Sequence, residues 1–399
     1  MIAQTATRLG TPKPLYSGPA ILSGSFKVFF LSAALWAVAA LVFWLMYIAS
    51  IGGDLGAQQN MLMWHAHELI YGYGGAVVAG FAFTAIPNWT GRTPLRGFEL
   101  GLLYTPWLIT RITATMLLFG YDLEGQRAIA EMAFYGLFVL FAMREIIAGK
   151  NWRNLKIIVV FSALLAAAFA ANLQRLGSLE YALPGWQAGL VVILLLICII
   201  GGRIIPAFTR NWMKREGIKA EPTMFNKFDA GAILAALVTL VAYSAGLSGL
   251  VLVALAGLTA LLHFARLYRW KGWLTIKSPI VMVLHMSYLW IPLGFLLLAL
   301  SETGIISDIT ALHAWTVGGI GSTTLAVMTR ASLGHSGQPL IDGWALTSIY
   351  IAVNVAAFSR VLASIWFDQY EALLSLSGIL WCMAFLLFVA KFAPNFFRR

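Results

Sequence analysis

Six histidines are the residues of this chain best suited to metal chemistry. They are His65, His67, His263, His285, His313 and His335. Five of them lie in apolar stretches, where ionisable side chains are costly and usually line a cavity, a cofactor or a proton path. Cys198 and Cys382 also lie in apolar runs and form no metal-ligand pattern, which excludes an iron–sulfur site and a disulfide scaffold. No Walker loop, nucleophile elbow or paired catalytic carboxylate appears, and no motif decides whether the chain is an enzyme.

Membrane-spanning helices must position these histidines, because the composition excludes a water-soluble fold. Hydrophobic residues make up 60% of the 399 residues, charged residues make up 11%, and the mean hydropathy is +0.82. Soluble domains carry about 25% charged residues. A span needs about 20 mostly apolar residues to cross about 30 Å of hydrocarbon. Twelve such runs occur, at 27–49, 62–86, 97–119, 128–147, 155–173, 187–206, 229–246, 249–266, 279–300, 309–329, 343–366 and 371–391.

We expect an all-α polytopic membrane protein with about twelve transmembrane helices in a single domain at 27–393, between cytoplasmic terminal segments at 1–26 and 394–399. The runs at 229–246 and 249–266 share a very short loop, so eleven or thirteen helices are alternatives. Charge favours twelve, because cytoplasmic loops collect Lys and Arg and 23 of the 27 basic residues then fall on one side. The net charge of +11 therefore follows from topology and requires no nucleic-acid partner. Residues 1–26 lack the apolar core and cleavage site of a removable signal peptide.

The second, sixth and tenth predicted helices end in related strings. These are IPNWTGR at Ile86–Arg92, IPAFTR at Ile205–Arg210 and VMTR at Val327–Arg330, and their threonines are separated by 119 and then 120 residues. The near-constant interval predicts three copies of a four-helix unit in a pseudo-threefold bundle. The alternative is chance, since Pro, Thr and Arg are common at cytoplasmic helix ends. Haem–copper oxidase catalytic subunits are also pseudo-threefold twelve-helix bundles, whose second and tenth helices supply haem-ligating histidines, but this is an architectural analogy only.

Three histidines lie at a similar depth, near the outer ends of the second and tenth predicted helices. Residues two apart on a helix point about 200° apart, so His65 and His67 face different directions. We expect His67 to face inward, because Tyr71 and a glycine-rich stretch follow it, and a similar stretch follows His313. Two histidines above close-packing glycines suit a flat cofactor with two axial imidazoles. We therefore predict that His67 and His313 bind one haem; the alternative is that these histidines form hydrogen bonds between helices.

The other histidines lie toward the inner side of the membrane. His285 is about seven residues above the inner end of its predicted helix, and His335 lies in the loop after the tenth helix. They form a possible second layer, separated in depth from the outer histidines. His263 lies close to an inner helix end, where an imidazole is tolerated, and we expect it to be structural.

Two arginines lie inside predicted helices, toward the outer half of the membrane. Arg111 is on the third helix and Arg360 on the eleventh. An arginine in hydrocarbon needs a partner, and haem propionates are suitable anions. We predict that both arginines anchor the haem; the alternative is a helix–helix ion pair with Glu131 or another acid.

Several motifs, in order along most of the chain, resemble those of the NnrS family of bacterial inner-membrane proteins. They are Trp64–Glu68, Ala79–Phe81, Ile86–Gly91, Gly201–Pro206, Leu284–His285, Tyr288–Trp290, His313–Gly321 and Met328–His335. The resemblance implies haem b and copper in a protein linked to denitrification and to tolerance of nitric oxide. By position it implies metal-binding roles for His65, His67, His285, His313 and His335. It leaves the division of these histidines between haem and copper open.

Three functions fit the residues and the resemblance. The expected one is a haem protein that binds or handles nitric oxide in the bacterial inner membrane, with the lipid bilayer and nitric oxide as partners. The others are a haem b redox protein that passes electrons, for example from quinol, and a metal-free secondary transporter. No Cys or Met cluster accompanies the histidines, so a copper site should be nitrogen-rich. Depth separates His65 from His335, so these two and His285 cannot all share one ion.

Overall fold

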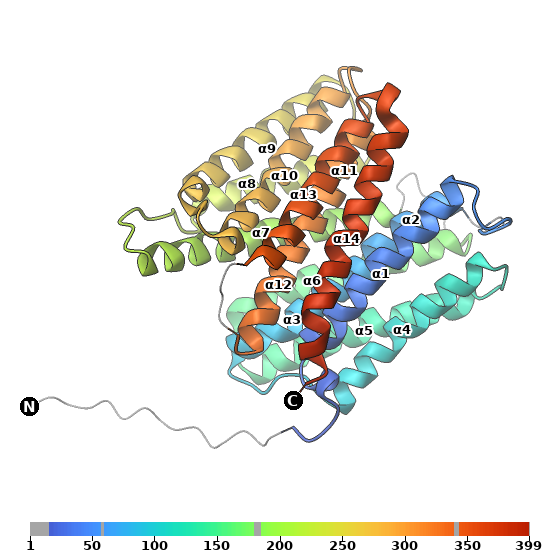
Figure 1. Cartoon of the computed structure of the whole chain (residues 1–399), viewed down its shortest axis with the longest axis horizontal. Helices are drawn as coiled ribbons and strands as arrows, with labels where there is room; N and C mark the ends of the chain where they lie inside the picture. Colours follow the sequence, from blue (N-terminus) through green and yellow to red (C-terminus); the bar gives the residue numbers. More distant parts are fainter. Residues whose placement is uncertain (1–15, 57–59, 179–184, 339–342, 399) are drawn as a thin grey trace, which may run out of the picture.

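The computed structural model describes residues 16–56, 60–178, 185–338 and 343–398, and within these ranges it contains helices and no strand. Figure 1 shows the helices packed side by side in one bundle. Their bounds are α1 Ser25–Ile48, α2 Met61–His67, η2 Glu68–Gly74, α3 Gly75–Thr90, α4 Phe98–Leu118, α5 Glu124–Ala148, α6 Leu155–Arg175, α7 Gly185–Arg215, α8 Lys227–Ser244, α9 Leu250–Arg269, α10 Pro279–Ser301, α11 Asp308–His313, η5 Ala314–Ser322, α12 Thr323–His335, α13 Trp344–Ala363 and α14 Tyr370–Phe396. Short 3₁₀ turns, among them η3 at Trp152–Asn154, connect some of them.

These helices form twelve rods, because α2, η2 and α3 continue as one rod and α11, η5 and α12 as another. Each rod coincides with one apolar run of the sequence, which confirms the predicted all-α fold with about twelve spans. Nine of the described rods are long and apolar enough to cross a membrane. The other three are α4, α5 and the rod of α11, η5 and α12. Of these, α5 carries charged residues in its first turns, from Glu124 to Glu131, and again near its end, at Arg144 and Glu145.

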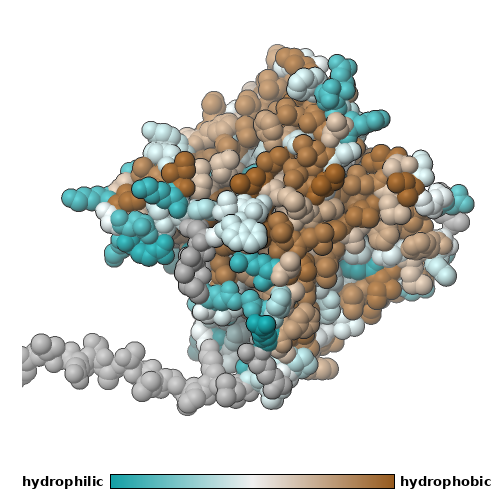
Figure 2. Space-filling view, viewed as in Figure 1, coloured by the Kyte–Doolittle hydropathy of each residue, from teal (hydrophilic) through white to brown (hydrophobic). Residues whose placement is uncertain are grey.

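The flank of the bundle is apolar. Val159, Leu261 and Ile379 lie within helices, and between 66% and 68% of each residue is exposed. Figure 2 shows that hydrophobic residues dominate the face in view, while hydrophilic residues gather toward its ends. Water would disfavour such a surface, whereas lipid tails match it. The chain is therefore an integral membrane protein.

Both ends of the helical domain lie at the same end of the bundle. Lys27, near the start of α1, donates to the backbone carbonyl of Arg398 at 3.4 Å, and Figure 1 shows the end of α14 beside the start of α1. We call this the terminal end. At the opposite end, which we call the distal end, the backbone of Gly56 donates to the carbonyl of Leu118 at 2.9 Å. An even number of crossings requires this arrangement.

The helices that end in the three related strings lie at the centre of the bundle. α12 packs against α3, and α7 packs against both η2 and η5. The hydroxyl groups of Tyr73 and Thr324 are hydrogen-bonded, which links η2 to α12. Val77, Ile197 and Val327, one from each helix, line a small apolar cavity of about 80 Å³. The threefold sequence repeat stays a prediction, but its three helices do meet.

Candidate functional site

Two histidines and one arginine come together near the distal end, from three different rods. His65 lies in α2, His313 ends α11, and Arg360 lies in the last turn of α13. Arg360 lies close enough to both imidazoles, and His65 lies close enough to His313, for their charges to interact. Arg360 donates to the hydroxyl of Ser364 at 2.6 Å and makes no salt bridge to a described residue. The outer group of histidines predicted from depth therefore contains His65 and His313.

The surroundings of these two imidazoles suit metal ligation. His313 holds its Nδ1 2.8 Å from the carbonyl oxygen of Ile309, so Nδ1 carries the proton and the lone pair is on Nε2. Metal-ligating histidines usually donate their second ring N–H to such a carbonyl. The ring of His65 stacks on Trp44, with 4.6 Å between ring centroids. The Nδ1 of His65 is buried without a hydrogen-bond partner among the described residues, which is unfavourable unless a further group binds there.

His67 has different neighbours, because it lies in a buried network of charged side chains. Its Nδ1 accepts a hydrogen bond from Arg127 at 2.9 Å, and its Nε2 lies 3.1 Å from a carboxylate oxygen of Glu131. Both ring nitrogens thus contact charged groups of α5. The opposite directions of His65 and His67 agree with their spacing on the helix. The haem-ligating role predicted for His67 stays a prediction. Its Nδ1 is hydrogen-bonded to Arg127, whereas its buried Nε2 lies beside the Glu131 carboxylate without a hydrogen bond to a described residue.

The network around His67 balances its own charge. Its cations are Arg111, Arg127 and Arg175, and its anions are Glu68, Glu124 and Glu131. Glu68 pairs with Arg111 and, at 2.5 Å, with Arg127. Three positive and three negative charges cancel while His67 is neutral. Such a set has no excess cation to offer an anionic cofactor.

Arg111 is held inside this network. It bonds to Glu68, and its Nη2 lies 3.7 Å from Glu131, the acid named above as its alternative partner. The guanidinium carbon also lies 5.4 Å from the ring centroid of Trp36. Gly72 allows this approach, because a Cβ at that position would collide with the Arg111 guanidinium. The predicted role of Arg111 as a haem anchor stays a prediction, and its contacts differ from those of Arg360.

Sequence reasoning missed Glu68 and Arg127 as members of this network. The predicted fourth span began at 128, which left Arg127 outside the membrane, whereas the corresponding helix, α5, begins at Glu124. The spacing could have shown the error. Arg127 and Glu131 are four residues apart and Glu124 and Arg127 are three apart, so all three share one helix face.

The inner histidines are separate from one another. His285 holds its Nε2 2.8 Å from the hydroxyl of Thr209, and its buried Nδ1 has no partner among the described residues. His335 ends α12 and packs against the ring of Phe26 at 5.8 Å. In the part of the chain that the structure describes, no group of three His, Cys, Asp or Glu side chains could hold a metal ion.

His263 has the structural role expected for it. Its Nδ1 lies 2.8 Å from the hydroxyl of Tyr288, and its Nε2 lies 3.0 Å from the carbonyl of Ala232. Both ring nitrogens are therefore satisfied by neutral partners in neighbouring helices, with no free nitrogen for a metal.

Both rods that carry outer histidines are π-helical immediately after them. η2 follows His67 over seven residues and η5 follows His313 over nine. π-helical segments are rare and are frequent at functional sites. A π-turn adds a residue to the helix turn and changes which side chains face inward. Hydropathy does not show this change. The inward-facing residues of these rods were therefore predicted as if the helices were α-helical throughout.

An all-α bundle with intramembrane histidines, two of them beside an arginine that makes no salt bridge to a described residue, defines a polytopic membrane protein with a candidate cofactor site. A family model described as NnrS protein matches residues 20–399. The chain therefore belongs to the NnrS family, as its motifs predicted. At the level of the family it is a membrane protein related to nitric oxide and to haem or metal. No curated protein matches the chain.

Proposed function

We propose that the chain is a haem protein of the bacterial inner membrane that acts in the response to nitric oxide, and that His65 and His313 hold the haem. The observation that carries this proposal is their placement. Both imidazoles lie near Arg360 at the distal end, and His313 has the carbonyl-bound Nδ1 typical of a metal ligand. Family membership supports haem and nitric oxide. We place both termini in the cytoplasm, so the haem would lie toward the periplasm.

The residues around His65 and His313 fit a haem. Arg360 has no salt-bridge partner among the described residues, so a propionate would satisfy its charge. Trp44, stacked on His65, offers an aromatic wall. Bound haem would supply an iron centre able to bind nitric oxide. The protein would hold the iron through two imidazoles and orient the cofactor through Arg360.

We also propose that copper, where present, binds at the inner histidines. Outside the charged network, two buried histidine nitrogens have no hydrogen-bond partner among the described residues. One is the Nδ1 of His65, and the other is the Nδ1 of His285. The hydroxyl of Thr209 fixes the ring through Nε2. Imidazole nitrogen suits copper. The copper would be separate from the haem, because His285 lies nearer the terminal end.

An optical spectrum of the purified full-length protein tests the proposed function. We expect a Soret band, a spectrum of the oxidised state typical of a haem held by two histidines, and a shift of the band when nitric oxide is added. The redox alternative predicts a Soret band that shifts when quinol reduces the iron and that nitric oxide leaves unchanged. A protein that folds, inserts and shows no haem after expression with excess haem would support a metal-free transporter and contradict the proposal.

A further inference from the structure

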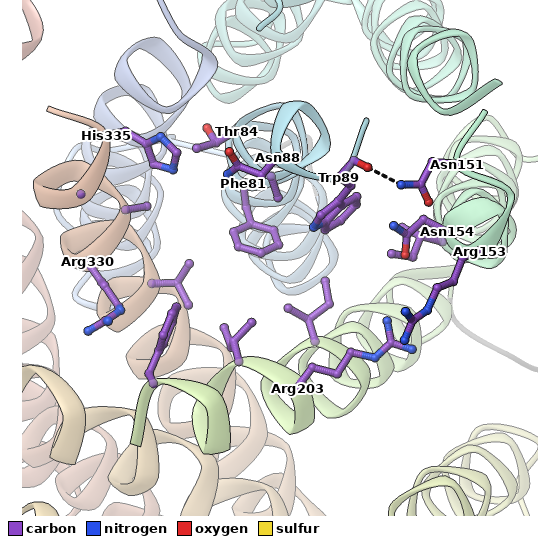
Figure 3. A pocket seen from close by; sticks show the side chains of 18 residues that line it. Phe81, Thr84, Asn88, Trp89, Asn151, Arg153, Asn154, Arg203, Arg330 and His335 are labelled. Atoms are coloured by element: carbon purple, nitrogen blue, oxygen red, sulfur yellow. Dashed lines mark hydrogen bonds between the residues drawn. The ribbon is translucent and has the colours of Figure 1, made fainter. Parts of the chain in front are cut away.

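A cavity of about 650 Å³ lies at the terminal end of the bundle, where the three related strings meet. Its walls come from α3, α7 and α12, and from η3 with the first residues of α6. Figure 3 shows Arg203 and Arg153 on one side of it and Arg330 and His335 on the other. It lies far along the rods from His65 and His313, so it is a separate feature of the molecule.

The charge of this cavity is one-sided. Arg153, Arg203, Arg330 and His335 are among its 18 described lining residues, and none of the 18 is acidic. Arg153 and Arg203 act on each other electrostatically, and Figure 3 shows their guanidinium groups side by side. Neither makes a salt bridge to a described residue. Two adjacent guanidinium groups repel each other, so an anion between them would be favourable.

Topology alone does not explain this arrangement. Basic residues that set orientation lie on loops and face lipid headgroups or water. Arg203 instead lies within α7, eleven residues after Val192, and the helix continues beyond it to Arg215. Its side chain points into a space between helices. Basic spaces between helices at this end of a membrane protein are places where anionic headgroups bind.

The floor of the cavity is apolar and aromatic. Phe81, Trp89 and Phe208 line it, together with aliphatic residues of α6 and α7. Arg330 packs over the ring of Phe208, with 3.7 Å from its guanidinium carbon to the ring centroid. The volume is in the range of sites that hold a drug-sized molecule. A small inorganic ion would occupy only part of it.

We propose that this cavity binds an amphiphilic anion, with a phosphate or carboxylate between Arg153 and Arg203 and an apolar body against Phe81, Trp89 and Phe208. The amide of Asn151, which donates to the carbonyl of Trp89, holds the wall that carries Arg153. The ligand comes either from the membrane, as a phospholipid, or from the cytoplasm, as a soluble metabolite. The proposal does not depend on the haem site.

Titration of the purified full-length protein in a neutral maltoside detergent tests this site. The probes are 1-naphthyl phosphate, 1-naphthol and inorganic phosphate. We expect 1-naphthyl phosphate to bind at least about tenfold more tightly than either of the others, because each of them lacks one half of the recognised chemistry. Arg203→Gln should weaken the binding of 1-naphthyl phosphate by about tenfold or more, which is the loss of affinity expected for one charge-assisted hydrogen bond.

Arg210→Gln is the matched control, because Arg210 lies seven residues later on α7, is exposed and does not line the cavity. Equal affinity of the two variants, or equal binding of 1-naphthol and 1-naphthyl phosphate, would overturn the proposal. The same titration in nanodiscs of defined lipid composition shows whether the ligand comes from the membrane or from the cytoplasm. If phosphatidylglycerol competes with 1-naphthyl phosphate and phosphatidylcholine does not, the site is assigned to a lipid. Binding that neither lipid affects assigns it to a soluble anion, and no binding of any anion refutes the site.

Discussion

Replacing Arg111 with leucine leaves the buried network around His67 with one more negative than positive charge. Arg111 bonds to Glu68 and lies 3.7 Å from Glu131, and the side chains of all three are at most 4% exposed. Breaking a buried ion pair by removing one partner is unfavourable by about 3–5 kcal/mol, since the remaining charge is neither solvated nor paired. Because Arg127 still pairs with Glu68 at 2.5 Å, we expect Arg111→Leu to lower the free energy of unfolding by less than this, by about 1–3 kcal/mol.

A double variant separates lost charge balance from lost packing. Arg111→Leu with Glu68→Gln removes one positive and one negative charge, so the network is again balanced. We expect this double variant to be more stable than Arg111→Leu alone. The measurement is the midpoint of thermal unfolding in detergent, followed by size-exclusion chromatography, for the wild type, both single variants and the double variant. The haem content of the folded fraction should not change in Arg111→Leu.

Two results would refute this reasoning. A double variant as unstable as the two single losses added together would show that Arg111 and Glu68 are not coupled, because independent sites are additive within about 0.5 kcal/mol. Loss of haem at an unchanged unfolding midpoint would show that Arg111 anchors the cofactor, as the sequence alone predicted.

Three further predictions concern packing, copper and topology. Gly72→Ala should destabilise the protein by about 1–3 kcal/mol through overpacking against Arg111. Gly101 has open space around it, so Gly101→Ala should not destabilise the protein. Equal thermal unfolding midpoints of the two variants would contradict this prediction. His285→Ala should lower the copper content measured by mass spectrometry, while His263→Ala should leave copper unchanged in the folded fraction; full copper in His285→Ala would remove the inner site. A green fluorescent protein fused after residue 399 should fluoresce, because we place the C-terminus in the cytoplasm, and an active alkaline phosphatase fused there would show the reverse.

The twelve rods could be predicted from the sequence because hydropathy over about 20 residues is a local property. The residues at which the helices start and end are less well determined by local hydropathy. The predicted sixth span ended at 206, but α7 continues to Arg215, since its last two turns are polar and extend beyond the apolar run. Arg203 lies within the predicted span, but the terminal-end cavity that it lines depends on how α3, α7 and α12 pack together, which hydropathy does not report.

The partner of each outer histidine could not be predicted in the same way. The sequence showed that His65 and His67 face different directions, and this is what the structure has. It did not show which of them faces His313, because the answer depends on the rotation of α2 relative to α5 and α13. The glycines after His67 suggested a cofactor surface, but Gly72 makes room for Arg111.

Haem content of three histidine variants tests the central assignment most directly. His65→Ala and His313→Ala should each lose the bound haem or its two-histidine spectrum in the folded, membrane-inserted protein. His67→Gln should keep both, because glutamine can still accept from Arg127 and donate to Glu131, and because the imidazole of His67 is engaged by those residues. Loss of haem in His67→Gln together with full haem in His65→Ala would contradict the account and return the haem to His67.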